Sequence, residues 1–122
     1  MKSQAYRMAM LYDFYGDLLT ERQKEFYDLY YNDDLSLSEI AENYDITRQG
    51  VRDIVVRAER TLEDIEEKTG FIRQYHEVRA ITMTLRRTCD AIQELNHAKW
   101  NDAGLELLCK TLDKAIEDLG RD

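Results

Sequence analysis

With 122 residues, no proline, five glycines and 34% charged side chains, the chain has the composition of one small domain with long, surface-charged helices rather than strands. Its net charge of -8 opposes non-specific attraction to phosphate backbones, so any contact with nucleic acid must be local. Charges interrupt every apolar stretch and the first ten residues lack a secretory pattern, which excludes membrane insertion and predicts a cytoplasmic protein.

Helical periodicity and capping residues predict three helices before residue 46. The first runs from Gln4 to Tyr15 and stops near Gly16. Thr20 and Ser36 are each followed three positions later by Gln or Glu, the capping-box arrangement that begins a helix. The run 32–34 ends the second helix, and the third has room for only two turns.

Residues 45–47 are too few for anything except a tight turn, after which Thr47 is suited to cap a longer helix that reaches about Lys68. One side of this helix is apolar at 3.6-residue spacing and is the predicted packing face: Val51, Ile54, Val55, Ala58, Leu62 and Ile65. The order of short helix, turn and long helix is typical of a helix-turn-helix unit.

The opposite side of the long helix is polar and is the candidate nucleic-acid site, formed by Thr47, Arg48, Gln49, Arg52, Asp53, Arg57 and Arg60. Thr47 and the free amides of the first turn suit a phosphate, while the arginines and Gln49 suit base edges or backbone. Four arginines against Asp53 and Glu59 leave a local charge of +2 between residues 47 and 60. The alternative is that the arginines only balance neighbouring acids on a solvated surface.

After Gly70, apolar residues recur at spacings of four and three and predict a coiled-coil-like seam: Phe71, Tyr75, Val78, Thr82, Leu85, Cys89 and Ile92. Residues 96–102 interrupt the pattern. A last amphipathic helix then carries Leu105, Leu108, Leu112, Ala115, Ile116 and Leu119. Residues 1–70 are therefore expected to form a helix-turn-helix domain without a wing, and residues 71–122 a helical hairpin or half of a homodimer interface.

No catalytic, cofactor or metal site is predicted, so the chain is expected not to be an enzyme. Cys89 and Cys109 belong to no C-x-x-C pair and are expected to be reduced core residues. His76 and His97 have no ligand partner at metal spacing. Asp33 and Asp34 lie between two helices, where turn capping is their expected role.

Two stretches carry a family resemblance. Ser36-Leu-Ser-Glu-Ile-Ala-Glu with Thr47-Arg-Gln-Gly-Val-Arg-Asp-Ile resembles region four of bacterial primary sigma factors over residues 20–68. The longer set Tyr12-Asp-Phe-Tyr-Gly-Asp-Leu-Leu-Thr-Glu-Arg-Gln and Leu29-Tyr-Tyr-Asn-Asp-Asp-Leu-Ser closely resembles the YlxM family of signal recognition particle-associated proteins, over roughly residues 5–70. Arg52 and Gly50 stand where that family often has tyrosine and alanine, and Arg52 moves the helix toward the DNA-binding sigma pattern.

The resemblance implies an all-α regulatory protein of the bacterial signal recognition particle pathway that binds DNA or the particle RNA at the long helix. It also implies the particle GTPase or its receptor as a protein partner. One alternative is an acidic adaptor that regulates these GTPases and keeps the fold without binding nucleic acid, which the net charge of -8 favours. Another is a structural module in which the heptad seam makes a homodimer.

Overall fold

The structure is a computed structural model that describes residues 4–120, which fold into six α-helices with no strand among them. In chain order the helices are α1 (Ala5–Tyr15), α2 (Glu21–Tyr31), α3 (Leu37–Tyr44), α4 (Arg48–Thr69), α5 (Phe71–Leu95) and α6 (Ala103–Leu119). Single short turns of 3₁₀- and π-helix follow α1 (Gly16–Leu18) and α5 (Asn96–Trp100). The expectation of an all-α fold is confirmed.

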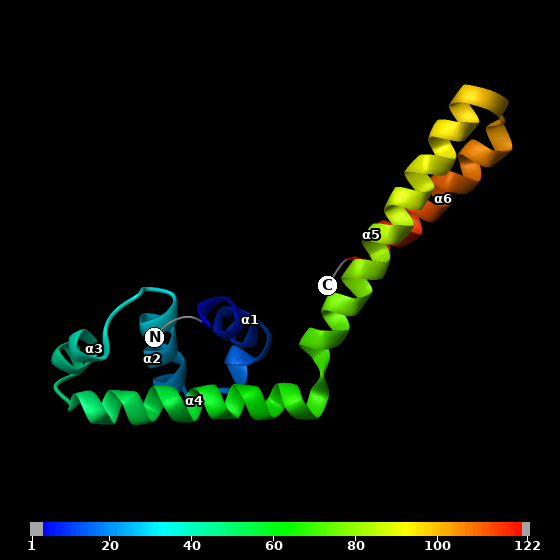
Figure 1. The fold of residues 1–122 in the computed structure, drawn as a ribbon. Helices are drawn as coiled ribbons and strands as arrows, with labels where there is room; N and C mark the ends of the chain where they lie inside the picture. Colours follow the sequence, from blue (N-terminus) through cyan, green and yellow to red (C-terminus); the bar gives the residue numbers. More distant parts are fainter. Residues whose placement is uncertain (1–3, 121–122) are drawn as a thin grey trace. The chain divides into compact units, whose positions relative to one another are not determined.

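The chain forms two compact units, residues 1–72 and residues 73–122. In the first unit, α1, α2 and α3 all pack against the same long helix, α4 (Figure 1). Apolar side chains meet there in two clusters. One joins α1 and α2 to the second half of α4 around Leu11, Tyr27 and Leu62, and the other joins α2 and α3 to the first half of α4 around Phe26, Ile40 and Val51.

Both predicted capping boxes are present. The Thr20 hydroxyl accepts from the Gln23 backbone N–H at 3.2 Å, and the Ser36 hydroxyl accepts from the Glu39 N–H at 3.0 Å, with each partner side chain accepting in return from the capping residue's N–H. Each box satisfies two amides that a helix start leaves free. Helices α2 and α3 therefore begin where the sequence predicts.

We expect Ser36→Ala to lower the free energy of unfolding by about 1 kcal/mol, because it removes the cap of α3. Ser38→Ala is the matched control, since Ser38 is exposed in the first turn of the same helix and caps nothing. Its effect should stay within about 0.5 kcal/mol. Urea titration followed by circular dichroism measures both, and equal losses in the two variants would contradict the capping role.

Helix α4 ends at Gly70, whose φ of 64° lies in the left-handed region that glycine adopts without strain. Glu66 fixes the start of α5, because its Oε1 accepts from the Tyr15 hydroxyl at 2.6 Å and from the Ile72 N–H at 3.0 Å. Ile72 consequently lies in the core of the first unit, 6% exposed, whereas Phe71 is 56% exposed. Phe71, the first residue of the predicted seam, is therefore exposed in this chain, and Ile72 belongs to the core of the first unit.

In the second unit, α5 and α6 form a helical hairpin (Figure 1). Cys89 and Cys109 are both buried and unpaired as thiols, and the Cys89 thiol faces the Cys109 carbonyl oxygen at 3.6 Å. Burial raises the pKa of the Cys89 thiol to about 11, which keeps it protonated and unreactive at neutral pH. At the tip, the buried Asn96 side chain bonds both the N–H and the carbonyl of Asp102, closing the turn.

Within residues 4–120, no helix has the combination of length and apolar character that spanning a bilayer requires. The same residues contain no group of three or more His, Cys, Asp or Glu side chains arranged to hold a metal ion.

Candidate nucleic-acid interface

The turn between α3 and α4 has the geometry that a helix-turn-helix unit needs. Asp45 ends α3 in the left-handed conformation, with φ of 53°, which Asp tolerates better than most residues. The Ile46 N–H donates back to the Ala41 carbonyl at 3.2 Å. Thr47 then caps α4, its hydroxyl oxygen accepting from the Gly50 N–H at 2.9 Å. The three residues 45–47 therefore connect the two helices directly, as the spacing predicts.

Gly50 has a specific reason to be glycine in this turn. A Cβ atom added there would lie 3.1 Å from the Thr47 hydroxyl oxygen, closer than ordinary van der Waals contact. An alanine would make the cap shift by a few tenths of an ångström. Glycine at position 50 therefore leaves the Thr47 cap undistorted. This offsets part of the roughly 1 kcal/mol that glycine costs relative to alanine within a helix.

The predicted packing face of α4 is the one that faces α1, α2 and α3. Val51, Val55, Ala58 and Leu62 are buried, and Ile54 and Ile65 are half-buried. The candidate site residues lie on the other side and are all exposed: Thr47, Arg48, Gln49, Arg52, Asp53, Arg57 and Arg60. The structure thus leaves these seven residues accessible between residues 47 and 60, with Arg48 and Arg52 on one flank of the helix and Arg57 on the other.

The four arginines of this surface differ from most other basic residues that the structure describes. Their guanidinium groups have no carboxylate or aromatic partner within residues 4–120. Other basic side chains are engaged, such as Arg7 with Glu63 at 2.9 Å and Lys24 with Asp17 at 2.7 Å. The arginines of α4 are therefore available to an external anion.

Of the two acids near these arginines in the sequence, Glu59 is bonded to another helix. Glu59 accepts a hydrogen bond from the hydroxyl of Tyr31 in α2, which draws its carboxylate to the packed side of α4. Asp53 stays on the exposed side and accepts from the Gln49 amide at 3.0 Å. The exposed surface thus carries four positive groups and one carboxylate, and that carboxylate holds the orientation of a side chain able to read an adenine edge.

The helix preceding the turn contributes no positive charge. The polar residues of α3 include Glu39 and Glu42, both exposed, and Glu39 is committed to the capping box. Negative charge at this position repels a phosphate backbone. Any docking on nucleic acid must therefore rely on α4, which limits the number of phosphate contacts.

Three tyrosines of α1 and α2, namely Tyr12, Tyr27 and Tyr31, are packing residues. Tyr27 is fully buried, its hydroxyl donating to the Met8 carbonyl at 2.6 Å, and its ring stacks on Tyr12 at 5.3 Å between centroids. Tyr31 packs against Tyr27 at 4.7 Å. These rings hold α1 to α2 and are not free to stack on single-stranded bases.

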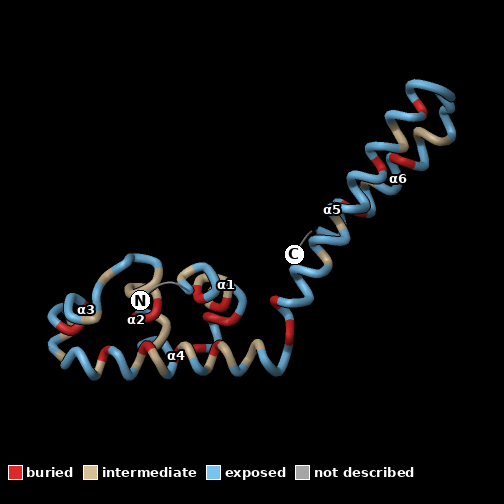
Figure 2. Tube along the Cα trace, viewed as in Figure 1, coloured by how far each residue is buried: buried red, intermediate tan, exposed pale blue. Residues whose placement is uncertain are grey.

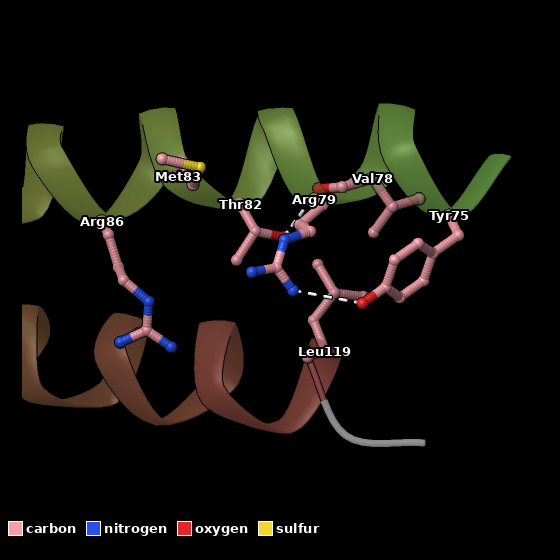
Figure 3. A pocket seen from close by; sticks show the side chains of 8 residues that line it. Tyr75, Val78, Arg79, Thr82, Met83, Arg86 and Leu119 are labelled. Carbon is pink, nitrogen blue, oxygen red and sulfur yellow. Dashed lines mark hydrogen bonds between the residues drawn. The ribbon is translucent and has the colours of Figure 1, made fainter. Parts of the chain in front are cut away.

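A second basic feature, which the sequence did not predict, is a cleft of about 320 Å³ in the hairpin. Arg79 and Arg86 flank it from α5, with Leu119 of α6 opposite (Figure 3). The Arg79 guanidinium donates to the Tyr75 hydroxyl at 3.1 Å, while Arg86 extends toward α6. The signal in the sequence was the seven-residue spacing of the two arginines, which places them on one side of a helix.

Comparison with known proteins gives one consistent family. The family model described as helix-turn-helix protein, YlxM / p13 like, matches residues 2–101. A UPF0122 protein of Geobacillus kaustophilus is 44% identical over 114 residues, which cover 93% of this chain and 98% of the relative. One from a Thermoanaerobacter species is 38% identical over 112 residues, 92% of each chain, and one from Desulforamulus reducens is 53% identical over 70 residues, 57% of this chain and 60% of the relative.

Proposed function

Because the chain belongs to the family of YlxM/p13-like helix-turn-helix proteins, we propose that it is a non-enzymatic regulatory protein that binds nucleic acid through the first half of α4. The observation that carries the proposal is the exposed set of Arg48, Arg52, Arg57 and Arg60, which have no partner within the described chain although the protein has a net charge of -8. Arginines kept away from so many available carboxylates suit an external anionic partner.

Different parts of α4 would contact different parts of the nucleic acid. The first-turn amides and the Thr47 hydroxyl would hold a phosphate at the positive end of the helix dipole. Arg48 and Arg52 would reach the backbone or guanine edges, and Gln49, oriented by Asp53, would face the bases. Arg57 and Arg60, one to two turns further on, would contact the flanking backbone.

The kind of nucleic acid follows from groove shape. The major groove of B-form DNA is wide enough to admit an α-helix, whereas the major groove of duplex RNA is too deep and narrow. Groove shape therefore favours duplex DNA. The family resemblance instead favours the RNA of the signal recognition particle, on which α4 would have to use an irregular loop or the backbone. The protein would act in the bacterial cytoplasm in either case.

We expect Arg48→Ala combined with Arg52→Ala to weaken nucleic-acid binding by about 10- to 100-fold, as the loss of two charged contacts implies. Fluorescence polarisation with duplex DNA and with the particle RNA, each across a salt series, measures the affinity. The logarithmic salt dependence should become shallower by about two, one for each lost phosphate contact.

The matched control is Lys110→Ala combined with Lys114→Ala, which removes the same two charges from the exposed side of α6. This control should change the affinity for nucleic acid by less than about threefold, because salt screens charges that do not touch the nucleic acid. Equal losses in both double variants would show a general charge effect and contradict a site on α4. No binding to either nucleic acid at low salt would contradict the proposal as a whole.

In that second case, the account to pursue is an acidic adaptor that binds a GTPase of the signal recognition particle or its receptor. One observation favours it, which is the group of four acids at the end of α4, where Asp64 and Glu67 are exposed. Beside them, Glu63 bonds Arg7, and Glu66 accepts from Tyr15. Such a surface complements a basic, RNA-binding partner. Under either function, the proposal divides the chain into a helix-turn-helix domain (1–70) and a helical extension (71–122).

A further inference from the structure

The helical hairpin has very little core of its own. Among residues 73–120, only four are buried: Cys89, Asn96, Cys109 and Ile116. Figure 2 shows the consequence, with exposed residues along most of α5 and α6. Most of the stability of a helix in a protein comes from packing of its apolar side, and the core of a unit below about 70 residues rarely stabilises a fold alone. The hairpin therefore needs further cover.

Large apolar side chains lie exposed on this same hairpin. On α5 they include Ile81 (59% exposed), Leu85 (42%) and Leu95 (44%), and on α6 they include Leu108 (64%) and Leu112 (48%). Met83 and Leu107 are exposed as well, on other sides of these helices. At 100° per residue, the α5 set with half-buried Ile92 falls within an arc of about 80°, and the α6 set with half-buried Leu105 within about 60°. Each helix thus has one apolar side that the other helix does not cover.

The two apolar sides lie on the same flank of the hairpin. Cys89 and Cys109 mark the line along which the helices touch. Gln93 lies about 40° around the axis of α5 from Cys89, and Asp113 lies about 40° around the axis of α6 from Cys109, in the same rotational direction. Their hydrogen bond of 3.1 Å shows that this direction leads to the same flank of the hairpin on both helices. The apolar sets are rotated in the opposite sense on both helices, so together they form a single face, here called the apolar face.

The apolar face contains no charged residue. On its flank, from Val78 to Leu95 of α5 and from Gly104 to Ile116 of α6, every residue is aliphatic, Thr, Ala or Gly. At the hairpin tip the face borders an open hollow of about 660 Å³, which is lined by Trp100, Gly104, Leu105 and Leu108 and by one acid, Asp102. In a chain with 34% charged residues, a strip without charges along two helices indicates a surface that another molecule covers.

We propose that the apolar face is the interface with a second copy of this chain, two hairpins packing face to face as a four-helix bundle. A copy brings the same charge-free face, so two molecules of net charge -8 meet without opposing like charges. Ile81, Leu85, Leu95, Trp100, Leu108 and Leu112, each about half exposed, offer on the order of 500 Å² per copy. The pair buries on the order of 1,000 Å², which is what a specific interface needs.

This interface differs from the seam that the sequence suggests. Cys89 and Ile92, together with Val78 and Thr82, turn toward α6 of the same chain and are buried or half-buried there. The proposed contact shares Leu85 with that seam and otherwise uses residues outside it, such as Ile81 and Leu95. The bundle therefore uses the hairpin as its unit, as antiparallel four-helix bundles do.

Sedimentation velocity on the full chain, from about 1 to about 100 μM, tests the proposal at the concentrations where an interface of this size assembles. We expect a species of twice the 14.5 kDa chain mass, or 29.0 kDa. Leu108→Glu combined with Leu112→Glu should raise the dimer dissociation constant at least about 100-fold, because two buried charges would face their own copies across the two-fold axis.

Leu107→Glu is the control, since Leu107 is 65% exposed but points away from the apolar face. It should leave the dimer intact. A monomeric wild type at the highest concentration would overturn the proposal, as would dissociation by Leu107→Glu alone. If the double variant loses helicity, hydrogen exchange of the wild type decides: the dimer requires slower exchange across α6 at high concentration than at low, and equal rates would refute it.

Discussion

Replacing Ile72 by alanine should lower the free energy of unfolding of the first unit by about 2 to 5 kcal/mol, whereas Phe71→Ala should change it by less than about 1 kcal/mol. Ile72 is 6% exposed in the cluster that includes Leu11 and Leu62, and alanine would leave a cavity there. Phe71 is 56% exposed, so removing its side chain creates almost no cavity in the core, although the side chain is larger.

The two adjacent variants form a strict comparison because both change the same turn of α5. Near-ultraviolet circular dichroism of tyrosine during urea unfolding reports on the first unit, since all tyrosines except Tyr75 lie in residues 1–72. A larger loss for Phe71→Ala than for Ile72→Ala would mean that Phe71 is the buried residue, as the heptad spacing suggests. It would contradict the geometry set by Glu66 at the start of the helix.

The stability of the first unit should fall steeply above about pH 10, the ordinary pKa of tyrosine. Burial raises the pKa of Tyr27, whose hydroxyl donates to the Met8 carbonyl. Burial and the hydrogen bond to Glu59 raise the pKa of Tyr31. The folded state therefore keeps both protons after the unfolded chain begins to lose them.

The sign follows from proton linkage. Below the unfolded pKa both states hold the protons, and the full stabilisation is present. As pH rises through the interval between the unfolded and folded pKa values, the unfolded chain binds fewer protons and stability is lost, by up to about 1.4 kcal/mol per pH unit for each tyrosine. The two residues together should give a slope of up to about 2.7 kcal/mol per pH unit.

Urea titrations between about pH 8 and pH 12 measure this slope around the ordinary tyrosine pKa. Tyr31→Phe should reduce it by up to about one proton's share, because phenylalanine does not titrate. Tyr6→Phe is the control for loss of an exposed hydroxyl, since Tyr6 is 75% exposed. An unchanged slope in the Tyr31 variant would show that the alkaline transition arises from other groups. At neutral pH, Tyr31→Phe should also cost stability by removing a hydrogen bond to a charged group.

Much of the fold was predictable because the signals are local. The capping boxes of Thr20 and Ser36 join residues three apart, so the sequence alone placed the starts of α2 and α3. The packing face of α4 follows from the 3.6-residue period of Val51, Val55 and Leu62, and the exposed position of the arginines follows as its complement. Helix, turn and helix were determined by the order of residues in the chain.

The tertiary structure decided what depends on partners distant in the sequence. It paired Glu59 with Tyr31 and Glu63 with Arg7, 28 and 56 residues away, and so left the arginines of α4 without neutralising partners. It also selected Ile72 over Phe71 for the core. Periodicity places a residue on a side of a helix, but which side is covered, and by which charge, is fixed only when the helices pack against one another.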